Sequence, residues 1–138
     1  MMRKVLTCAG FLALSLLAGF PVKATTISGT IDVDDVFTAY LSTNPNTLGT
    51  QIATGNNWFA NPPVSLSGVP LNPGQTYYLQ IIATNLGGPA AFIGDFSLSD
   101  SGFAFSNSGQ HLLTDTTDWT GNLGGVGLHL RARFFQKA

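Results

Sequence analysis

Cysteine, glutamate and basic residues are all scarce in this sequence. Cys8 is the only cysteine, all seven acidic residues are aspartates, and no lysine or arginine occurs from residue 24 to residue 130. Charged residues make up only 9% of the 138-residue chain, which is too few for a typical disordered protein. Heptads, a Gly-X-Y period and a basic excess are also missing, which argues against a coiled coil, a collagen-like chain and a nucleic-acid-binding protein. The length suits one domain.

The first 24 residues have the pattern of a cleaved secretory signal peptide. A basic start with Arg3 and Lys4 precedes an apolar run over residues 5–20, and small residues stand at 22 and 24. This run is shorter than the roughly 20 residues needed to cross a bilayer, and Pro21 ends it, so we expect no membrane span after cleavage. Cys8 lies at the start of the run, unlike a lipid-accepting cysteine. We therefore predict secretion, to the periplasm or the cell surface of a bacterium.

Cleavage after residue 24 would leave an acidic chain. Residues 25–138 hold three basic residues, Arg131, Arg133 and Lys137, and seven aspartates, which gives a formal charge of −4. Such a body repels nucleic acid and anionic lipid surfaces, and it is compatible with a neutral glycan or a bound cation. Because no cysteine remains, one hydrophobic core has to stabilise the domain without a disulfide.

Alternating apolar and polar residues predict an all-β domain over residues 25–127. Ile27, Gly29, Ile31 and Val33 fall on one face of a first strand at period two. Further strands are expected at residues 36–42, 48–54, 64–66, 76–85, 90–98, 103–105 and 112–119. Turn residues separate them, and residues 72–74 (NPG) suit a type II turn. We predict an antiparallel β-sandwich or jelly roll, with residues 76–85 as a central strand and no helix except that of the signal peptide.

Residues 128–138 differ from the rest in composition, because they hold every basic residue of the mature chain. One interpretation is a final strand with a solvated basic end. The other is a tail that was not selected together with the domain, for instance after a frameshift. On composition alone we place a domain boundary at residue 127 and treat 128–138 as an atypical basic C-terminal tail.

Three segments resemble small exported proteins that carry a PEP-CTERM sorting signal. They are residues 28–42 (SGTIDVDDVFTAYLS), 71–90 (LNPGQTYYLQIIATNLGGPA) and 92–100 (FIGDFSLSD). The resemblance covers residues 26–127, and it implies a galactose-binding-like β-sandwich with a role at the cell surface or in the extracellular matrix, with glycan binding as one activity. The Val-Pro-Glu-Pro motif, membrane helix and basic cluster that close such proteins do not occur in this sequence.

Asp32, Asp34 and Asp35 form the densest group of carboxylates. Three acids within four residues could supply oxygen ligands to Ca²⁺, although the spacing is not that of an EF-hand. The alternative is a corner in which the side chains of Asp34 and Asp35 accept backbone N–H bonds. Calcium is the only cofactor that the sequence suggests.

Aromatic and amide residues suggest a carbohydrate site at a loop edge. Trp58 follows Asn56 and Asn57 in a polar loop, and Trp119 follows a second polar stretch. Aromatic rings stack on the apolar faces of sugars, while amides bond the hydroxyl groups. The alternative for each tryptophan is a place in the core, and one tyrosine of the Tyr77–Tyr78 pair has to face inward.

The sequence carries no motif for catalysis. A Ser-His-Asp triad with His111 and Asp115 would need a nucleophile elbow, which is missing, and the two histidines lack the spacing of known zinc sites. We therefore predict a secreted, non-catalytic surface or matrix module whose partner is an exopolysaccharide or another glycan. A small extracellular hydrolase is the alternative, and it requires His111 to meet Asp115 or Asp118 and a serine in one cleft.

Overall fold

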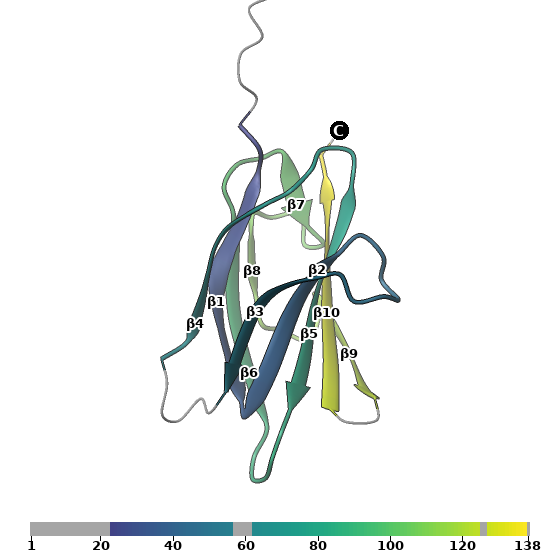
Figure 1. Cartoon of the computed structure of the whole chain (residues 1–138). Helices are drawn as coiled ribbons and strands as arrows, with labels where there is room; N and C mark the ends of the chain where they lie inside the picture. Colours follow the sequence, from purple (N-terminus) through teal and green to yellow (C-terminus); the bar gives the residue numbers. More distant parts are fainter. Residues whose placement is uncertain (1–22, 57–61, 125–126, 138) are drawn as a thin grey trace, which may run out of the picture.

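Two antiparallel β-sheets packed face to face make up the part of the protein that the structure describes (Figure 1). The computed structural model describes residues 23–56, 62–124 and 127–137. One sheet has four strands in the order β4-β1-β6-β8, and the other has six, in the order β3-β2-β5-β10-β7 with β9 also paired to β10. The strands are β1 (Thr26–Asp34), β2 (Val36–Ser42), β3 (Thr50–Asn56), β4 (Val64–Pro70), β5 (Thr76–Thr84), β6 (Ala91–Leu98), β7 (Phe103–Phe105), β8 (His111–Leu113), β9 (Trp119–Gly124) and β10 (Gly127–Gln136).

The prediction of an all-β antiparallel sandwich is confirmed. Ile27, Ile31 and Val33 of β1 are buried, as their period-two spacing indicated. β5 is central in its sheet, between β2 and β10. Gly74 has a φ of 79°, which the third position of a type II turn requires and glycine adopts without strain. The described residues include no helix that could span a membrane, and the predicted signal-peptide helix lies outside them.

The segment predicted as one strand over residues 112–119 is instead two strands in different sheets. β8 pairs with β6, and β9 pairs with β10. Between them, the carboxylate of Asp115 accepts the backbone N–H groups of Asp118 and Thr117 at 2.7 and 2.8 Å. These two bonds hold the pKa of Asp115 below its ordinary value. A side chain that bonds its own following backbone in this way makes a turn, which explains why no single strand forms.

The domain boundary predicted at residue 127 is wrong, because residues 127–136 form an interior strand. β10 pairs with β5 along one edge, and its other edge carries β9 and β7 end to end. Ala132 and Phe134 are 1% and 0% exposed, while Arg131 and Arg133 point to the other face. This alternation matches the final-strand interpretation and not a tail outside the domain.

The core lies between the inner faces of the two sheets. Phenylalanines supply much of its volume, and Phe134 makes an edge-to-face contact with Phe105 and stacks against Tyr77. Tyr77 is the inward member of the tyrosine pair, and its hydroxyl accepts the N–H of Asn72 at 2.8 Å. Among the described residues, the largest fully buried side chains of this core are Phe96, Phe103, Phe105, Phe134, Ile27, Ile31, Leu71, Leu79, Ile81 and Leu112, and Gln80 is equally buried on the other face of its sheet.

Candidate functional site

A row of long side chains crosses the outer face of the six-stranded sheet. Strand register places Gln51 opposite Tyr40, Tyr40 opposite Gln80, Gln80 opposite Arg131, and Arg131 opposite Thr120. Directly opposed residues point to the same face, and neighbouring strands are about 4.8 Å apart. Five strands therefore contribute polar or aromatic groups to one continuous line.

The β2–β3 loop, residues 43–49, folds over this row, and two side chains of the sheet beneath it bond its carbonyl groups. Gln80, which is 0% exposed, donates from Nε2 to the carbonyl oxygens of Asn44 and Thr47 at 3.1 and 3.0 Å. Arg131 donates from Nη1 to the carbonyl oxygen of Pro45 at 2.8 Å. Within the loop, the Asn44 side chain accepts the N–H of Asn46, which closes a tight turn. The loop is thus a wall fixed to the sheet at three carbonyl groups.

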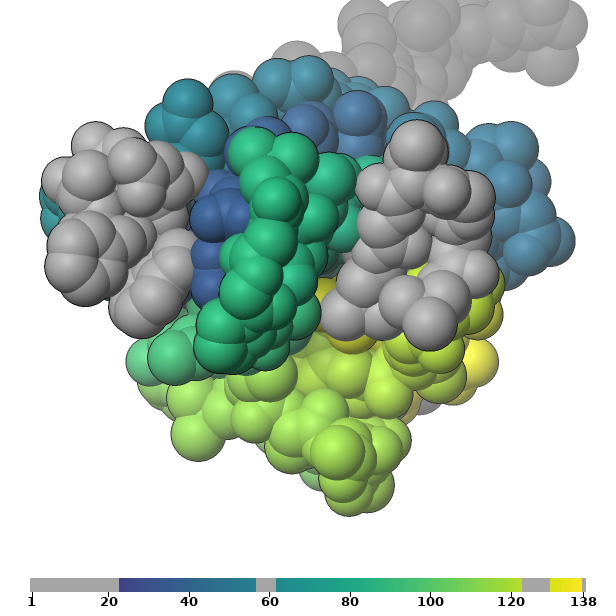
Figure 2. Space-filling view, turned by 90° about the horizontal axis from the view of Figure 1, so that it is seen from below, coloured from purple at the N-terminus to yellow at the C-terminus, as the bar shows by residue number. Residues whose placement is uncertain are grey.

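A cleft of about 310 Å³ lies between this loop and β9. Its lining residues are Pro45, Asn46, Thr120, Gly121, Asn122 and Arg131. In the end-on view, the β2–β3 loop projects from the side of the molecule in blue, next to yellow-green β9 (Figure 2). Amide, hydroxyl and guanidinium groups converge in the cleft, a set that can bond the hydroxyl groups of a sugar.

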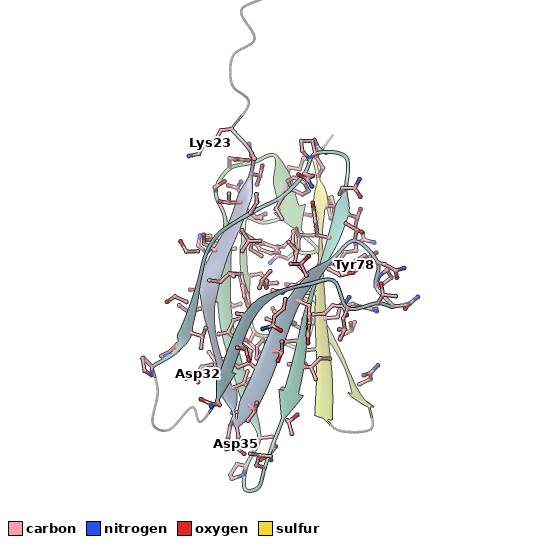
Figure 3. All side chains as sticks on the ribbon, in the orientation of Figure 1. Lys23, Asp32, Asp35 and Tyr78 are labelled. Atoms are coloured by element: carbon pink, nitrogen blue, oxygen red, sulfur yellow. The ribbon has the colours of Figure 1, made fainter. Side chains whose placement is uncertain are left out.

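Each arginine of β10 makes a cation–π contact with an aromatic ring. The Arg131 guanidinium carbon lies 5.8 Å from the centre of the Tyr78 ring, and that of Arg133 lies 5.6 Å from the centre of the Phe135 ring. Tyr78 is half-buried and lies close to the β2–β3 loop (Figure 3). The contact with Tyr78 restrains the Arg131 guanidinium next to the cleft, whereas Arg133 lies outside the cleft lining.

A second hollow, of about 600 Å³, lies on the opposite side of the same loop. Its lining combines apolar side chains, among them Leu41, Leu48, Ile52 and Val69, with hydroxyl and amide groups. Unlike the cleft, it has no charged side chain among its described lining residues.

The three aspartates expected to bind calcium do not converge. Asp34 is 8% exposed at the β1–β2 corner, and Asp35 accepts the N–H of Leu86 at 2.6 Å. Asp35 lies at the end of the sandwich and Asp32 further along β1 (Figure 3). Across the described ranges, no three His, Cys, Asp or Glu side chains form a group that could hold a metal ion. The calcium prediction is therefore corrected. As the corner alternative expected, the Asp35 side chain accepts a backbone N–H, but the donor lies in the β5–β6 turn and not in the corner itself.

The candidate carbohydrate residues have different outcomes. Asn57 and Trp58 lie outside the described residues, so their predicted role stays a prediction. Asn56 is exposed at the end of β3, beside a hollow of about 20 Å³, which has room for a water molecule but not for a sugar ring. Trp119 is 7% exposed, donates from Nε1 to the Leu113 carbonyl at 3.0 Å and contacts the Phe92 ring edge to face. Trp119 is a core residue, which corrects its assignment as a sugar-stacking ring.

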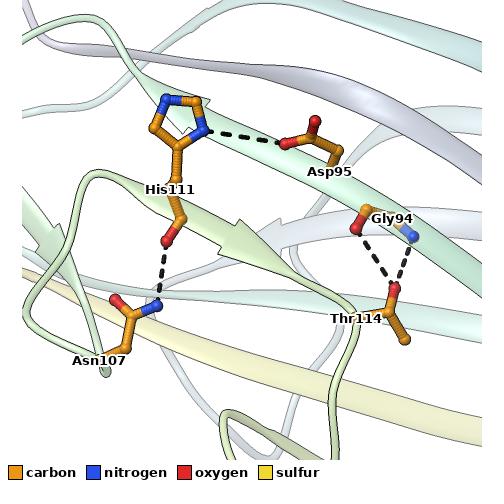
Figure 4. Close-up of polar contacts among 5 residues, drawn as sticks. All are labelled: Gly94, Asp95, Asn107, His111 and Thr114. Carbon is orange, nitrogen blue, oxygen red and sulfur yellow. Dashed lines mark hydrogen bonds and ion pairs between the residues drawn. The ribbon is translucent and has the colours of Figure 1, made fainter.

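His111 does not meet the acids that a hydrolase would need. Its Nδ1 lies 3.9 Å from Oδ1 of Asp95 on the outer face of the four-stranded sheet, and both side chains are largely exposed (Figure 4). Asp115 bonds its own turn, and Asp118 accepts a bond from the Ser106 hydroxyl at 3.3 Å. Among the hydrogen bonds of the described residues, none joins the His111 ring to a serine.

Sequence reasoning missed Arg131, Thr120 and Asn122 as site residues. The signal was available: apolar residues at 128, 130, 132 and 134 alternate with His129, Arg131 and Arg133, which is the period of a half-buried strand. The charge of this segment sets it apart from the rest of the chain, although its period is that of the other strands. No sequence pattern showed that the β2–β3 loop would fold back over the sheet.

We compared the chain with protein-family models, curated proteins and solved structures, and none of the three comparisons found a match.

Proposed function

We propose that this protein is a secreted, non-catalytic β-sandwich module of the cell surface or extracellular matrix, and that it binds a glycan in the cleft between the β2–β3 loop and β9. The observation that carries this proposal is the convergence of Asn46, Thr120, Asn122 and Arg131 on one open hollow of about 310 Å³. Sugars present hydroxyl groups in two roles, as donors and acceptors, and side-chain amides match both roles.

The rigidity of the cleft also supports binding. Its floor is β10, an interior strand of the six-stranded sheet. Its wall is the β2–β3 loop, which Gln80 and Arg131 hold to the sheet by hydrogen bonds to three loop carbonyl groups. Preorganised groups lose little conformational entropy when a ligand binds, which matters for a shallow sugar site. An exopolysaccharide is the expected partner, because an open cleft admits a chain that continues at both ends.

A glycan array, probed with the mature protein with and without calcium, tests this function. We expect binding to a subset of glycans without added calcium. The double variant Asn46→Ala/Asn122→Ala should weaken binding by about tenfold or more, since each lost hydrogen bond contributes about 1 kcal/mol. Asn72→Ala is the matched control, because Asn72 is exposed and lies outside this cleft. No binding to any glycan, or equal losses in both variants, would remove the proposal.

A further inference from the structure

The positive charge of the mature chain is concentrated on one surface, although the chain as a whole is acidic. Arg131 and Arg133 lie two residues apart on β10 and face the same side of the six-stranded sheet, so they are about 7 Å apart along the strand. Lys137, the other basic residue of the mature chain, follows the end of the same strand. Among the described residues that line the cleft, Arg131 is the charged one.

Neither arginine is neutralised by an ion pair within the described part of the chain. The ion pair found there joins His111 to Asp95 on the other sheet. Asp118 precedes β9, and its carboxylate accepts a bond from the Ser106 hydroxyl. Asp32, Asp34 and Asp35 belong to β1 and the corner after it. Among the described residues, no carboxylate lies within ion-pair distance of the Arg131 guanidinium, and its charge is therefore available to an external anion.

The guanidinium of Arg131 is positioned like a binding group. It has five N–H donors, and among described residues its one hydrogen bond is from Nη1 to Pro45. The Tyr78 ring and the Pro45 carbonyl restrain its plane, while the remaining donors keep the forked geometry that matches a carboxylate. A carboxylated sugar can form two parallel charge-assisted hydrogen bonds with this guanidinium, whereas a neutral sugar cannot.

We infer that the glycan bound in this cleft is an acidic polysaccharide, and that Arg131 binds a uronate carboxylate of the chain while Asn46 and Asn122 bond its hydroxyl groups. This inference rests on the proposed function and specifies its ligand. Arg133, one step along the strand, attracts the next acidic residue of the same polymer. The −4 charge of the mature chain repels such a polymer elsewhere, so it restricts binding to this face.

The test compares a galacturonate tetramer with its methyl ester, which has the same sugar rings and ring hydroxyl groups but carries an uncharged methyl ester in place of each carboxylate. Binding of the mature protein is measured by calorimetry at low and at physiological ionic strength. We expect the acid to bind at least tenfold more tightly than the ester, with an affinity that falls as salt is added. Arg131→Gln should lower the affinity for the acid by about tenfold or more, and Arg131→Lys should restore part of it, since it keeps the charge but loses the fork.

Lys137→Gln is the matched control, because it removes the same charge from the end of β10, outside the cleft. Thermal melts show whether each variant is folded. If Arg131→Gln does not fold, the test uses the affinity of Arg131→Lys for the acid instead. Equal losses in Arg131→Gln and Lys137→Gln would indicate nonspecific attraction and overturn the inference. Equal binding of acid and ester, lost in Asn46→Ala/Asn122→Ala, would overturn it while leaving the glycan-binding function. Binding of neither ligand, with a silent glycan array, would overturn both.

Discussion

Replacing Gln80 by leucine should destabilise the protein and loosen the wall of the cleft. The side chain is fully buried and donates to the carbonyl oxygens of Asn44 and Thr47. Each hydrogen bond contributes about 1 kcal/mol net, and a buried carbonyl left without its donor costs about 1–3 kcal/mol more unless the loop opens to water. We therefore expect the free energy of unfolding to fall by about 2–4 kcal/mol. The loss should not be larger, because the loop can open and let water bond the two carbonyl groups.

Urea denaturation followed by circular dichroism measures this loss. Gln51→Leu is the control, because Gln51 is exposed in the same row of the same sheet, and it should change stability by no more than about 0.5 kcal/mol. Gln80→Glu should cost more than Gln80→Leu, since it buries a carboxylate against two carbonyl oxygens. If Gln80→Leu unfolded at the same urea concentration as Gln51→Leu, the loop would not depend on Gln80 and the account of the wall would be refuted.

Three further predictions concern the core and its polar edge. Phe134→Ala should lower the free energy of unfolding by about 3–5 kcal/mol in urea denaturation, because the ring is fully buried on an interior strand. Thr25→Val should raise the pKa of Asp100 toward its ordinary value, measured by carboxyl ¹³C NMR, because the Thr25 hydroxyl bond at 2.7 Å is the main cause of the lowered pKa. Gln110→Met should raise the melting temperature, since Gln110 Nε2 is a buried donor without a partner in the described structure.

The sign of the pH effect at Asp100 follows from the direction of its shift. Its pKa is lower in the folded protein, so its charged form stabilises the fold above the unfolded pKa, and this contribution is lost as the pH falls through the folded pKa. Thr25→Val should therefore make the protein less sensitive to acid in that range. A small loss in Phe134→Ala, an unmoved Asp100 titration or a lower melting temperature for Gln110→Met would each count against the contact concerned.

Strand positions were predictable wherever one face of a strand is buried, because burial imposes a period of two on the sequence. Ile27, Ile31 and Val33 identified β1 in this way, and Thr76–Thr84 stood out by its β-branched and aromatic residues. The split between β8 and β9 was not predictable from period alone. It depends on the hydrogen bonds of Asp115 within a turn, which compete with a continuous strand.

The candidate site was much less predictable than the fold. Arg131 becomes a site residue only because β10 inserts beside β5, a pairing between segments about fifty residues apart. The wall over Gln80 is likewise a tertiary contact, and nothing local indicates that a glutamine in an apolar strand will hold a distant loop. Trp119 shows the converse error: a tryptophan after a polar stretch suggested an exposed ring, whereas the turn at Asp115 directs it into the core.

We place the binding surface on the outer face of the six-stranded sheet, at the β2–β3 loop and β9. Backbone amide NMR shifts recorded while the galacturonate tetramer is added test this placement. We expect the largest changes at Asn46, Thr120 and Arg131. Largest changes at Asp95 and His111 on the opposite sheet, or at Asn56 at the end of β3, would contradict it.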